Sequence, residues 1–137
     1  MTLDAHLDGL ERRALPDGLT LLVAGDRRSR ARGLARLDEL PPDHALLLQR
    51  CRSVHTAGMR FALDLLWLDG SGALVRLDHA VAPRRVRTCL RAKAVVEAAA
   101  GCGERFVAAL AARDGEFLAR TPKNSPLAVR RPGSGDD

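Results

Sequence analysis

The sequence predicts a mainly β domain with one or two short helices. Short apolar runs of strand length recur between turn signals, and the Gly-rich stretch 69–72 separates two of them as a hairpin connection. The 137 residues, 46% of them hydrophobic, can bury a core without help from disulfides or a metal. We therefore expect one domain at 10–119, preceded by a frayed segment at 1–9 and followed by a disordered tail at 120–137.

The first half of the domain is expected to contain three strands. Leu10–Leu15 and Leu19–Ala24 flank a Pro-Asp-Gly turn and predict a hairpin. The Arg-rich segment 26–37 predicts a short helix or helical turn, and the apolar run that follows predicts a strand at 44–51. Residues 52–59 are mixed in polarity and predict a bend or loop.

The second half begins with the strand around which the chain is organised. Leu63–Leu68 is apolar at every position except Asp64, and it precedes a partner strand at 73–79. A centred register places Asp64 opposite Leu77. Asp64 then lies on the more apolar face of this hairpin, and the opposite face is expected to be half exposed.

Three segments follow that hairpin. Residues 84–91 are basic and irregular, and Ala94–Ala98 is a short apolar stretch that Glu97 interrupts. From Glu104 onward the spacing of the apolar residues is typical of one helix, which Asp114-Gly115 ends.

Four motifs stand in order along the chain: Arg30-Ala31-Arg32-Gly33-Leu34, His55-Thr56-Ala57-Gly58-Met59-Arg60-Phe61-Ala62-Leu63-Asp64, Leu68-Asp69-Gly70-Ser71-Gly72 and Glu97-Ala98-Ala99-Ala100-Gly101. Together, over about residues 19–113, they resemble the Val-His-Thr variety of the bacterial and archaeal domain of unknown function 192. The resemblance implies a small antiparallel β-sandwich or barrel, in a family whose biochemical activity is not established. This chain has Ala35 where the family usually carries Met, so a Met-lined pocket is not carried over to it.

Asp64 is the residue on which a candidate binding site depends. An unpartnered carboxylate inside an apolar strand is strongly unfavourable, so Asp64 needs a partner. If the preceding segment folds back, Arg60 or His55 pairs with Asp64 and, with Thr56, forms the polar floor of a small cleft. Cys51 begins this segment, and the alternative is a buried structural network that holds the bend.

Cys51, His55 and Asp64 also define the first alternative function, a thiol-dependent enzyme. Cys51 and His55 are four residues apart, but in an extended backbone such side chains lie about 13 Å apart, too far for direct contact. No motif supplies an orienting group or oxyanion donors. We therefore favour a non-enzymatic protein with a packed thiol and a structural histidine.

A basic cluster carries five positive charges with no intervening acid, matching the net charge of +5, and consists of Arg84, Arg85, Arg87, Arg91 and Lys93. It predicts a site for a phosphate- or carboxylate-bearing ligand, while a solvated edge is the plainer interpretation. Nucleic-acid binding through Arg84–Lys93 is the second alternative function. It is not favoured, because no aromatic platform stands beside the charges.

These observations favour an accessory or binding module for a partner protein or a small anionic ligand. No stretch approaches the length of a membrane span and the N-terminus shows no signal-like apolar run, so we expect a cytoplasmic protein, and a monomer. The three cysteines lack the short spacings of zinc sites, so neither a metal nor another cofactor is expected. Whether Cys51 and Cys89 pair is left open.

Overall fold

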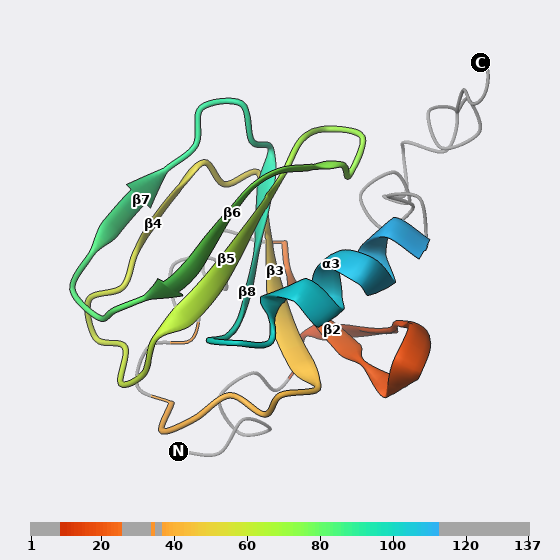
Figure 1. Cartoon of the computed structure of the whole chain (residues 1–137), viewed down its shortest axis with the longest axis horizontal. Helices are drawn as coiled ribbons and strands as arrows, with labels where there is room; N and C mark the ends of the chain where they lie inside the picture. The colour runs from red at the N-terminus through yellow and green to blue at the C-terminus, as the bar shows by residue number, and fades with distance from the viewer. Residues whose placement is uncertain (1–8, 26–33, 35–36, 113–137) are drawn as a thin grey trace.

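The computed structural model describes residues 9–25, 34 and 37–112 (Figure 1). The elements within them are β1 Glu11–Ala14, the 3-10 turn η1 Pro16–Gly18, β2 Thr20–Ala24, β3 His44–Gln49, β4 Ser53–His55, β5 Leu63–Leu68, β6 Leu74–Val81, β7 Val86–Thr88, β8 Ala94–Ala99 and the helix α3 Gly103–Ala112. The prediction of a mainly β domain with short helical pieces is confirmed.

Six of the strands form one sheet in the order β1-β2-β3-β8-β5-β6, and β4 and β7 form a separate sheet of two strands. The β2–β3 pair is parallel, and the other pairs in the described residues are antiparallel. The large sheet has β1 and β6 as its open edges. Of the two predicted architectures, the sandwich therefore fits the arrangement and the closed barrel does not.

The N-terminal predictions are confirmed where the structure describes them. The hairpin predicted at 10–24 is present as β1 and β2, with η1 between them. The strand predicted at 44–51 is β3, which ends at Gln49. The predicted helix at 26–37 lies outside the described residues apart from Leu34 and Leu37, and the predicted tail at 120–137 lies outside them entirely.

Two segments that were predicted to be irregular contain strands. Ser53–His55 and Val86–Thr88 pair antiparallel as β4 and β7, with Val54 opposite Arg87. We call this pair and its ends, residues 51–56 and 84–93, the ribbon. The prediction was wrong because three-residue strands are too short to show an alternating pattern, and their pairing joins segments that are distant in sequence.

Ala94–Ala99 forms β8, which lies between β3 and β5 in the middle of the large sheet. Every residue from Ala94 to Ala98 is buried, because the strand has a paired neighbour on each side and a packed layer over each face. This position explains why the segment is a nearly continuous apolar run.

The register of the β5–β6 hairpin differs from the predicted one. Leu77 lies opposite Leu66, not Asp64, and β6 extends to Val81. The turn already pairs Leu68 with Leu74, and a bulge between Trp67 and Leu68 adds to the shift. A second bulge lies opposite Asp64. At that bulge Ala80 adopts a φ of 49°, which turns its N–H toward the Asp64 carboxylate.

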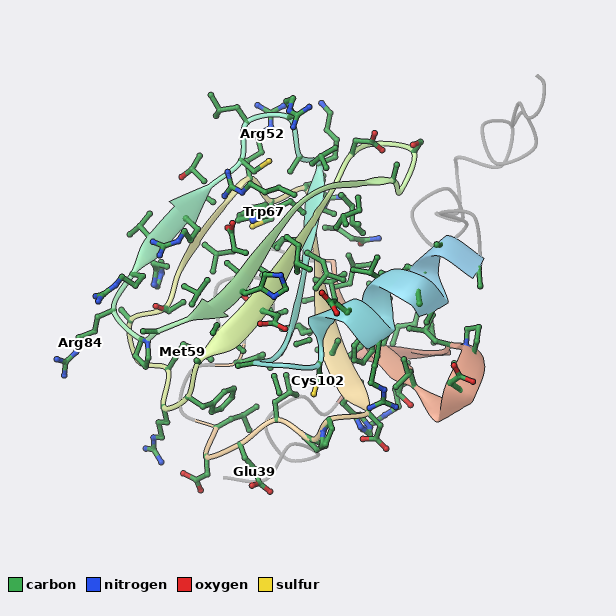
Figure 2. The ribbon with its side chains drawn as sticks, in the orientation of Figure 1. Glu39, Arg52, Met59, Trp67, Arg84 and Cys102 are labelled. Carbon is green, nitrogen blue, oxygen red and sulfur yellow. The ribbon has the colours of Figure 1, made fainter. Side chains whose placement is uncertain are left out.

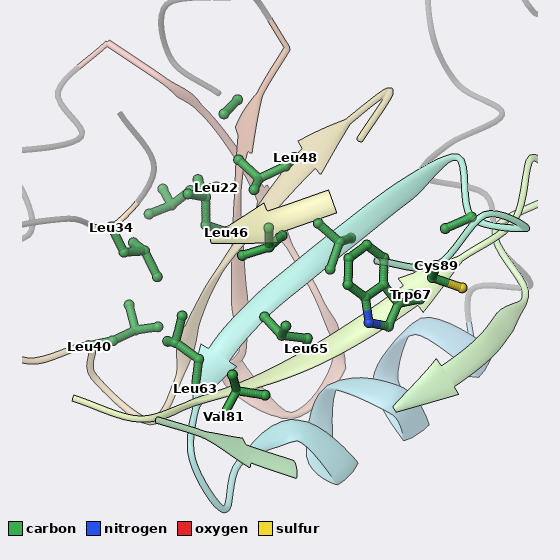
Figure 3. Close-up of a cluster of buried hydrophobic side chains, with 14 of the residues drawn as sticks. Leu22, Leu34, Leu40, Leu46, Leu48, Leu63, Leu65, Trp67, Val81 and Cys89 are labelled. Atoms are coloured by element: carbon green, nitrogen blue, oxygen red, sulfur yellow. The ribbon is translucent and has the colours of Figure 1, made fainter. Parts of the chain in front are cut away.

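Both faces of β5 are buried, although one was predicted to be half exposed. Leu66 packs with Phe106 of α3 on one face. On the other face Trp67 lies beside Cys89 at the end of the ribbon (Figure 3). Helix α3 therefore covers one face of the large sheet together with Leu15 and Leu19, which flank η1, and the ribbon covers the other face together with Leu34, Leu37 and Leu40.

Trp67, Arg76 and Asp78 of β5 and β6 bond to one another on the ribbon-covered face. The indole Nε1 of Trp67 donates to Asp78 at 3.0 Å, and Asp78 also accepts two bonds from Arg76. The Arg76 guanidinium lies 5.4 Å from the centre of the Trp67 ring, a cation–π contact. Because these polar groups bond to one another, the ribbon can cover this face of β5 and β6 although the face includes polar side chains.

Asp64 joins three segments of the chain and is only 1% exposed. Its Oδ1 accepts the N–H of Ala80 at 2.8 Å, and its Oδ2 accepts those of Gly101 at 3.0 Å and Gly103 at 2.8 Å. Gly103 begins α3, so the carboxylate accepts a helix N–H that has no partner within the helix. Its negative charge also interacts favourably with the positive end of the helix dipole. A Cβ at Gly103 would lie 2.8 Å from Oδ2, so this approach requires glycine.

Gly103→Ala tests the junction between Asp64 and α3. Alanine usually stabilises a helix relative to glycine by about 1 kcal/mol, but here the added Cβ meets the carboxylate. We expect the free energy of unfolding, measured by urea titration, to fall by about 1–3 kcal/mol. The control Ala108→Gly, at an exposed position of the same helix, should cost about 1 kcal/mol through propensity alone. A neutral or stabilising Gly103→Ala would show that Asp64 does not approach the helix this closely.

Candidate functional site

The structure gives Asp64 partners other than the predicted ones. Three backbone N–H groups satisfy its carboxylate, whereas Arg60 pairs with Asp38 at the surface. The predicted pairing of Asp64 with Arg60 or His55 is therefore wrong. Backbone donors satisfy the carboxylate without the burial of a second charged group, which explains why no cationic side chain is drawn inward.

The three residues of the thiol-enzyme alternative are not brought together. Strand β4 holds the backbone extended between Cys51 and His55, which corresponds to a separation of about 13 Å. The Cys51 thiol donates to the carbonyl of Ser53 at 3.3 Å, and His55 is exposed. Asp64 points toward α3, across the sheet from the ribbon.

The cysteines and other metal-binding side chains form no recognisable centre. Cys51, Cys89 and Cys102 are not joined by a disulfide. Among residues 9–25, 34 and 37–112, no group of three or more His, Cys, Asp or Glu side chains is placed to hold a metal ion.

Thr56 is the predicted site residue with the clearest local role. It is buried, its hydroxyl donates to the carbonyl of Ala82 at 2.8 Å, and it accepts the N–H of Arg85 at 2.8 Å. Its backbone also bonds to Arg84 and Arg85. Thr56 therefore pins the turn between β6 and β7 to the end of β4 and holds one end of the ribbon in place.

The ribbon brings the predicted basic cluster together with one further cation from the neighbouring strand. Its cationic side chains are Arg52, Arg84, Arg85, Arg87, Arg91 and Lys93. Figure 2 shows Arg52 and Arg84 at opposite ends of the ribbon. No Asp or Glu occurs in residues 44–63 or 79–96, the two segments that contain the ribbon strands. The ribbon is therefore a continuous region of positive charge.

Among the described residues these cations have no carboxylate partner, in contrast to three other arginines. Arg13, Arg60 and Arg76 each form an ion pair with a Glu or an Asp. The guanidinium groups of Arg52, Arg85, Arg87 and Arg91 instead donate to backbone carbonyls, and no ion pair joins a ribbon cation to a described residue. Within the described part of the chain, no carboxylate compensates their positive charge.

Two large apolar side chains are exposed among the cations. Val86 is 64% exposed and Leu90 is 76% exposed, the two highest values for large hydrophobic residues in the described part of the chain. Apolar side chains surrounded by a charged rim are typical of surfaces that bind proteins. Neither residue was predicted to take part in a site, because an isolated Val or Leu in a basic segment carries no signal of its own.

Glu97 is the residue of chemical interest that sequence reasoning missed. It is 4% exposed, and its neighbours across the adjoining strands are Leu46 and Leu65. Its Oε1 has no hydrogen-bond partner among the described residues. The available signal was the one applied to Asp64, a lone acid within an apolar strand.

Burial in this apolar layer raises the pKa of the Glu97 carboxyl to about 7. The folded protein therefore holds the proton more tightly than the unfolded chain, in which the pKa takes its ordinary value of 4.5. Stability is lost as the pH rises between these two values and stays at the lower level above them. The total loss is about 3 kcal/mol.

Glu97→Gln removes this ionisation. We expect the free energy of unfolding of the variant, relative to the wild type, to increase by about 3 kcal/mol between pH 4.5 and pH 8, measured by urea titration at each pH. Val95→Ala, on the same face of β8, is a control whose cost should not change with pH. A constant difference for Glu97→Gln across this range would mean that the carboxyl titrates normally.

Family comparison supports the resemblance noted in the sequence. The model of the DUF192 family, described as "Uncharacterized ACR", matches residues 11–110. The chain belongs to this family. The matched span begins with β1 and ends within α3, so it includes the large sheet and the ribbon. A search of curated proteins gives no match.

Two solved structures are similar in fold. One is a "putative transcription regulator" from Sinorhizobium meliloti 1021, with 24% identity, a TM-score of 0.58, and coverage of 69% of this chain and 82% of that one. The other is a protein of unknown function from Novosphingobium aromaticivorans DSM 12444, with 15% identity, a TM-score of 0.57, and coverage of 77% and 91%. No helix in the described residues is long and apolar enough to cross a membrane.

Proposed function

We propose that this chain is a non-enzymatic accessory module that binds an acidic partner through the ribbon. One observation carries the proposal: six cations lie together on the ribbon and none has a carboxylate partner within the described residues, whereas Arg13, Arg60 and Arg76 do. Exposed Val86 and Leu90 add apolar contacts that a hydrated anion would not use. A partner protein therefore suits the surface better than a small anionic ligand.

The spread of the charges supports the same choice. Arg85 and Cys89 bond to β4 at the two ends of β7, and a strand of this length spans about 13 Å. Arg91 lies beyond the second end. A single phosphate or carboxylate reaches one end of this row, whereas an acidic segment of a protein can contact both ends.

Nucleic acid is a second candidate partner. The Sinorhizobium protein of similar fold is described as a "putative transcription regulator", and phosphate groups are attracted to arginine-rich surfaces. However, residues 51–56 and 84–93 contain no Phe, Tyr or Trp on which bases can stack. This composition favours the acidic protein.

The proposal includes a cytoplasmic monomer. The three cysteines, an odd number without the short spacings of a disulfide framework, favour free thiols and a reducing compartment. A monomeric module leaves the whole ribbon accessible to a partner.

The triple variant Arg84→Gln/Arg85→Gln/Arg91→Gln neutralises both ends of the ribbon. We expect it to bind a fluorescein-labelled deca-glutamate peptide about tenfold more weakly, because each exposed charge contact contributes about 0.5 kcal/mol. Fluorescence anisotropy at low salt measures the affinity. A titration with added salt should reduce the difference between the variant and the wild type.

The matched control is Arg12→Gln/Arg13→Gln/Arg105→Gln, which removes the same net charge from β1 and α3. It should change the affinity by less than about twofold. Equal losses in the two triple variants would show general charge attraction and exclude the ribbon as a specific site. Tighter binding to a short DNA duplex than to the peptide would transfer the proposal to nucleic acid, and tighter binding to citrate would transfer it to a small ligand.

A further inference from the structure

We propose that the partner contributes an extended acidic segment that pairs with the outer edge of β7 as a third strand of the ribbon. This inference rests on the proposed function and specifies its mode of binding. It follows from the hydrogen-bonding pattern of β7, from the way both ends of the ribbon are held, and from the side chains along the edge.

The backbone groups of β7 that face outward can be assigned from its pairing with β4. Cys89 donates to Arg52 and Thr56 donates to Arg85, so the hydrogen-bonded positions of β7 alternate through Arg85, Arg87 and Cys89. The N–H and C=O groups of Val86 and Thr88 therefore point away from β4. One of them, the Val86 carbonyl, accepts the Arg87 guanidinium at 2.9 Å. The N–H groups of Val86 and Thr88 remain directed toward an incoming strand.

Both ends of this edge are held in position before any partner binds. Thr56 holds the Arg85 end through its hydroxyl and its backbone. At the other end, Ala92 donates to Cys89, and the Arg52 guanidinium donates to the Ala92 carbonyl at 3.3 Å. A pre-ordered strand loses little conformational entropy when a second strand pairs with it.

The side chains along β7 define the sequence that fits it. Val86 and Thr88 are exposed on one face, and Arg87 lies on the other face of the strand. An added strand with β-branched residues opposite Val86 and Thr88 and an acid opposite Arg87 would match this pattern. Further acids at its ends would meet Arg85 and Arg91.

The two edge strands of the large sheet are less suited to this role. Along β6, bulges interrupt the regular pairing geometry, and the Arg91 guanidinium lies 3.4 Å from the Val75 carbonyl. Edge strand β1 carries a Glu11–Arg13 ion pair, so it presents both signs of charge. The β7 edge combines regular geometry, positive charge and an exposed apolar residue.

The test uses an alternating peptide, an octapeptide of four Thr-Glu repeats that is acetylated at its N-terminus and amidated at its C-terminus. With Thr opposite Val86 and Thr88, the Thr N–H groups face β7 and the Glu N–H groups face away. N-methylation of all four Thr residues should weaken binding to the full-length protein at least tenfold. N-methylation of all four Glu residues should change it less than threefold, since those groups make no bond to the ribbon.

The reciprocal test changes the protein. Val86→Pro removes an outward N–H that β4 does not use, and proline is tolerated at such edge positions. It should weaken binding of the alternating peptide about tenfold, whereas Val86→Thr, which keeps the N–H and the branched shape, should change it less than threefold. Thermal melting confirms that each variant is folded, and the peptide series tests the mode on unaltered protein.

The outcomes separate the binding mode from the function. A loss of affinity on N-methylation of the Thr residues, but not of the Glu residues, supports strand addition. The comparison is a block peptide with the same blocked ends, in which four consecutive threonines precede four consecutive glutamates. If the block peptide and both methylated peptides bind as tightly as the unmethylated alternating peptide, the proposed strand pairing is overturned. Charge-driven binding at the ribbon then stands. If neither the alternating peptide nor deca-glutamate binds, the proposed function fails and the binding mode fails with it.

Discussion

The structure depends on one buried carboxylate that accepts three backbone N–H groups. Asp64 draws the bulge at Ala80 and the first turn of α3 to the same strand, so it determines where β6 bends and where the helix begins. The bulge is followed within two residues by Ala82, whose carbonyl accepts the Thr56 hydroxyl. The two faces of the sheet are thereby connected, because the acid that orients α3 on one face also sets the start of the turn that leads into the ribbon on the other.

Asp64 and Glu97 show that burial alone does not determine how a carboxylate behaves. Both lie on inner strands of the same sheet and both are inaccessible to solvent. Three backbone N–H groups replace water as hydrogen-bond donors to Asp64, so its carboxylate connects β5 to the Ala80 bulge and to α3. Glu97 lies among leucines with one oxygen lacking any described partner, and its proton becomes harder to remove. The availability of donors, rather than depth, distinguishes the surroundings of these two carboxylates.

Much of the fold could be predicted from the sequence, because local patterns determine it. The hairpin before Ala24, the apolar strand Leu63–Leu68 and the helix after Gly103 follow from periodicity and turn residues. The need of Asp64 for a partner was also predictable from its apolar surroundings. Its partners were not, since backbone groups of the Ala80 bulge have no signature in the residue types. The two short ribbon strands were missed for a related reason: pairing between distant segments, rather than local pattern, makes them strands.

In the function proposed above, the ribbon separates recognition from folding. Val54 faces the core from β4, whereas Ser53, His55, Val86 and Thr88 are exposed, so the residues that would meet the proposed partner are not the ones that pack in the core. Substitutions at these exposed ribbon residues can therefore occur without loss of core packing. If the ribbon binds a partner as proposed, substitutions at its exposed positions would change specificity while leaving the buried core unchanged, which makes it a place to engineer new specificities.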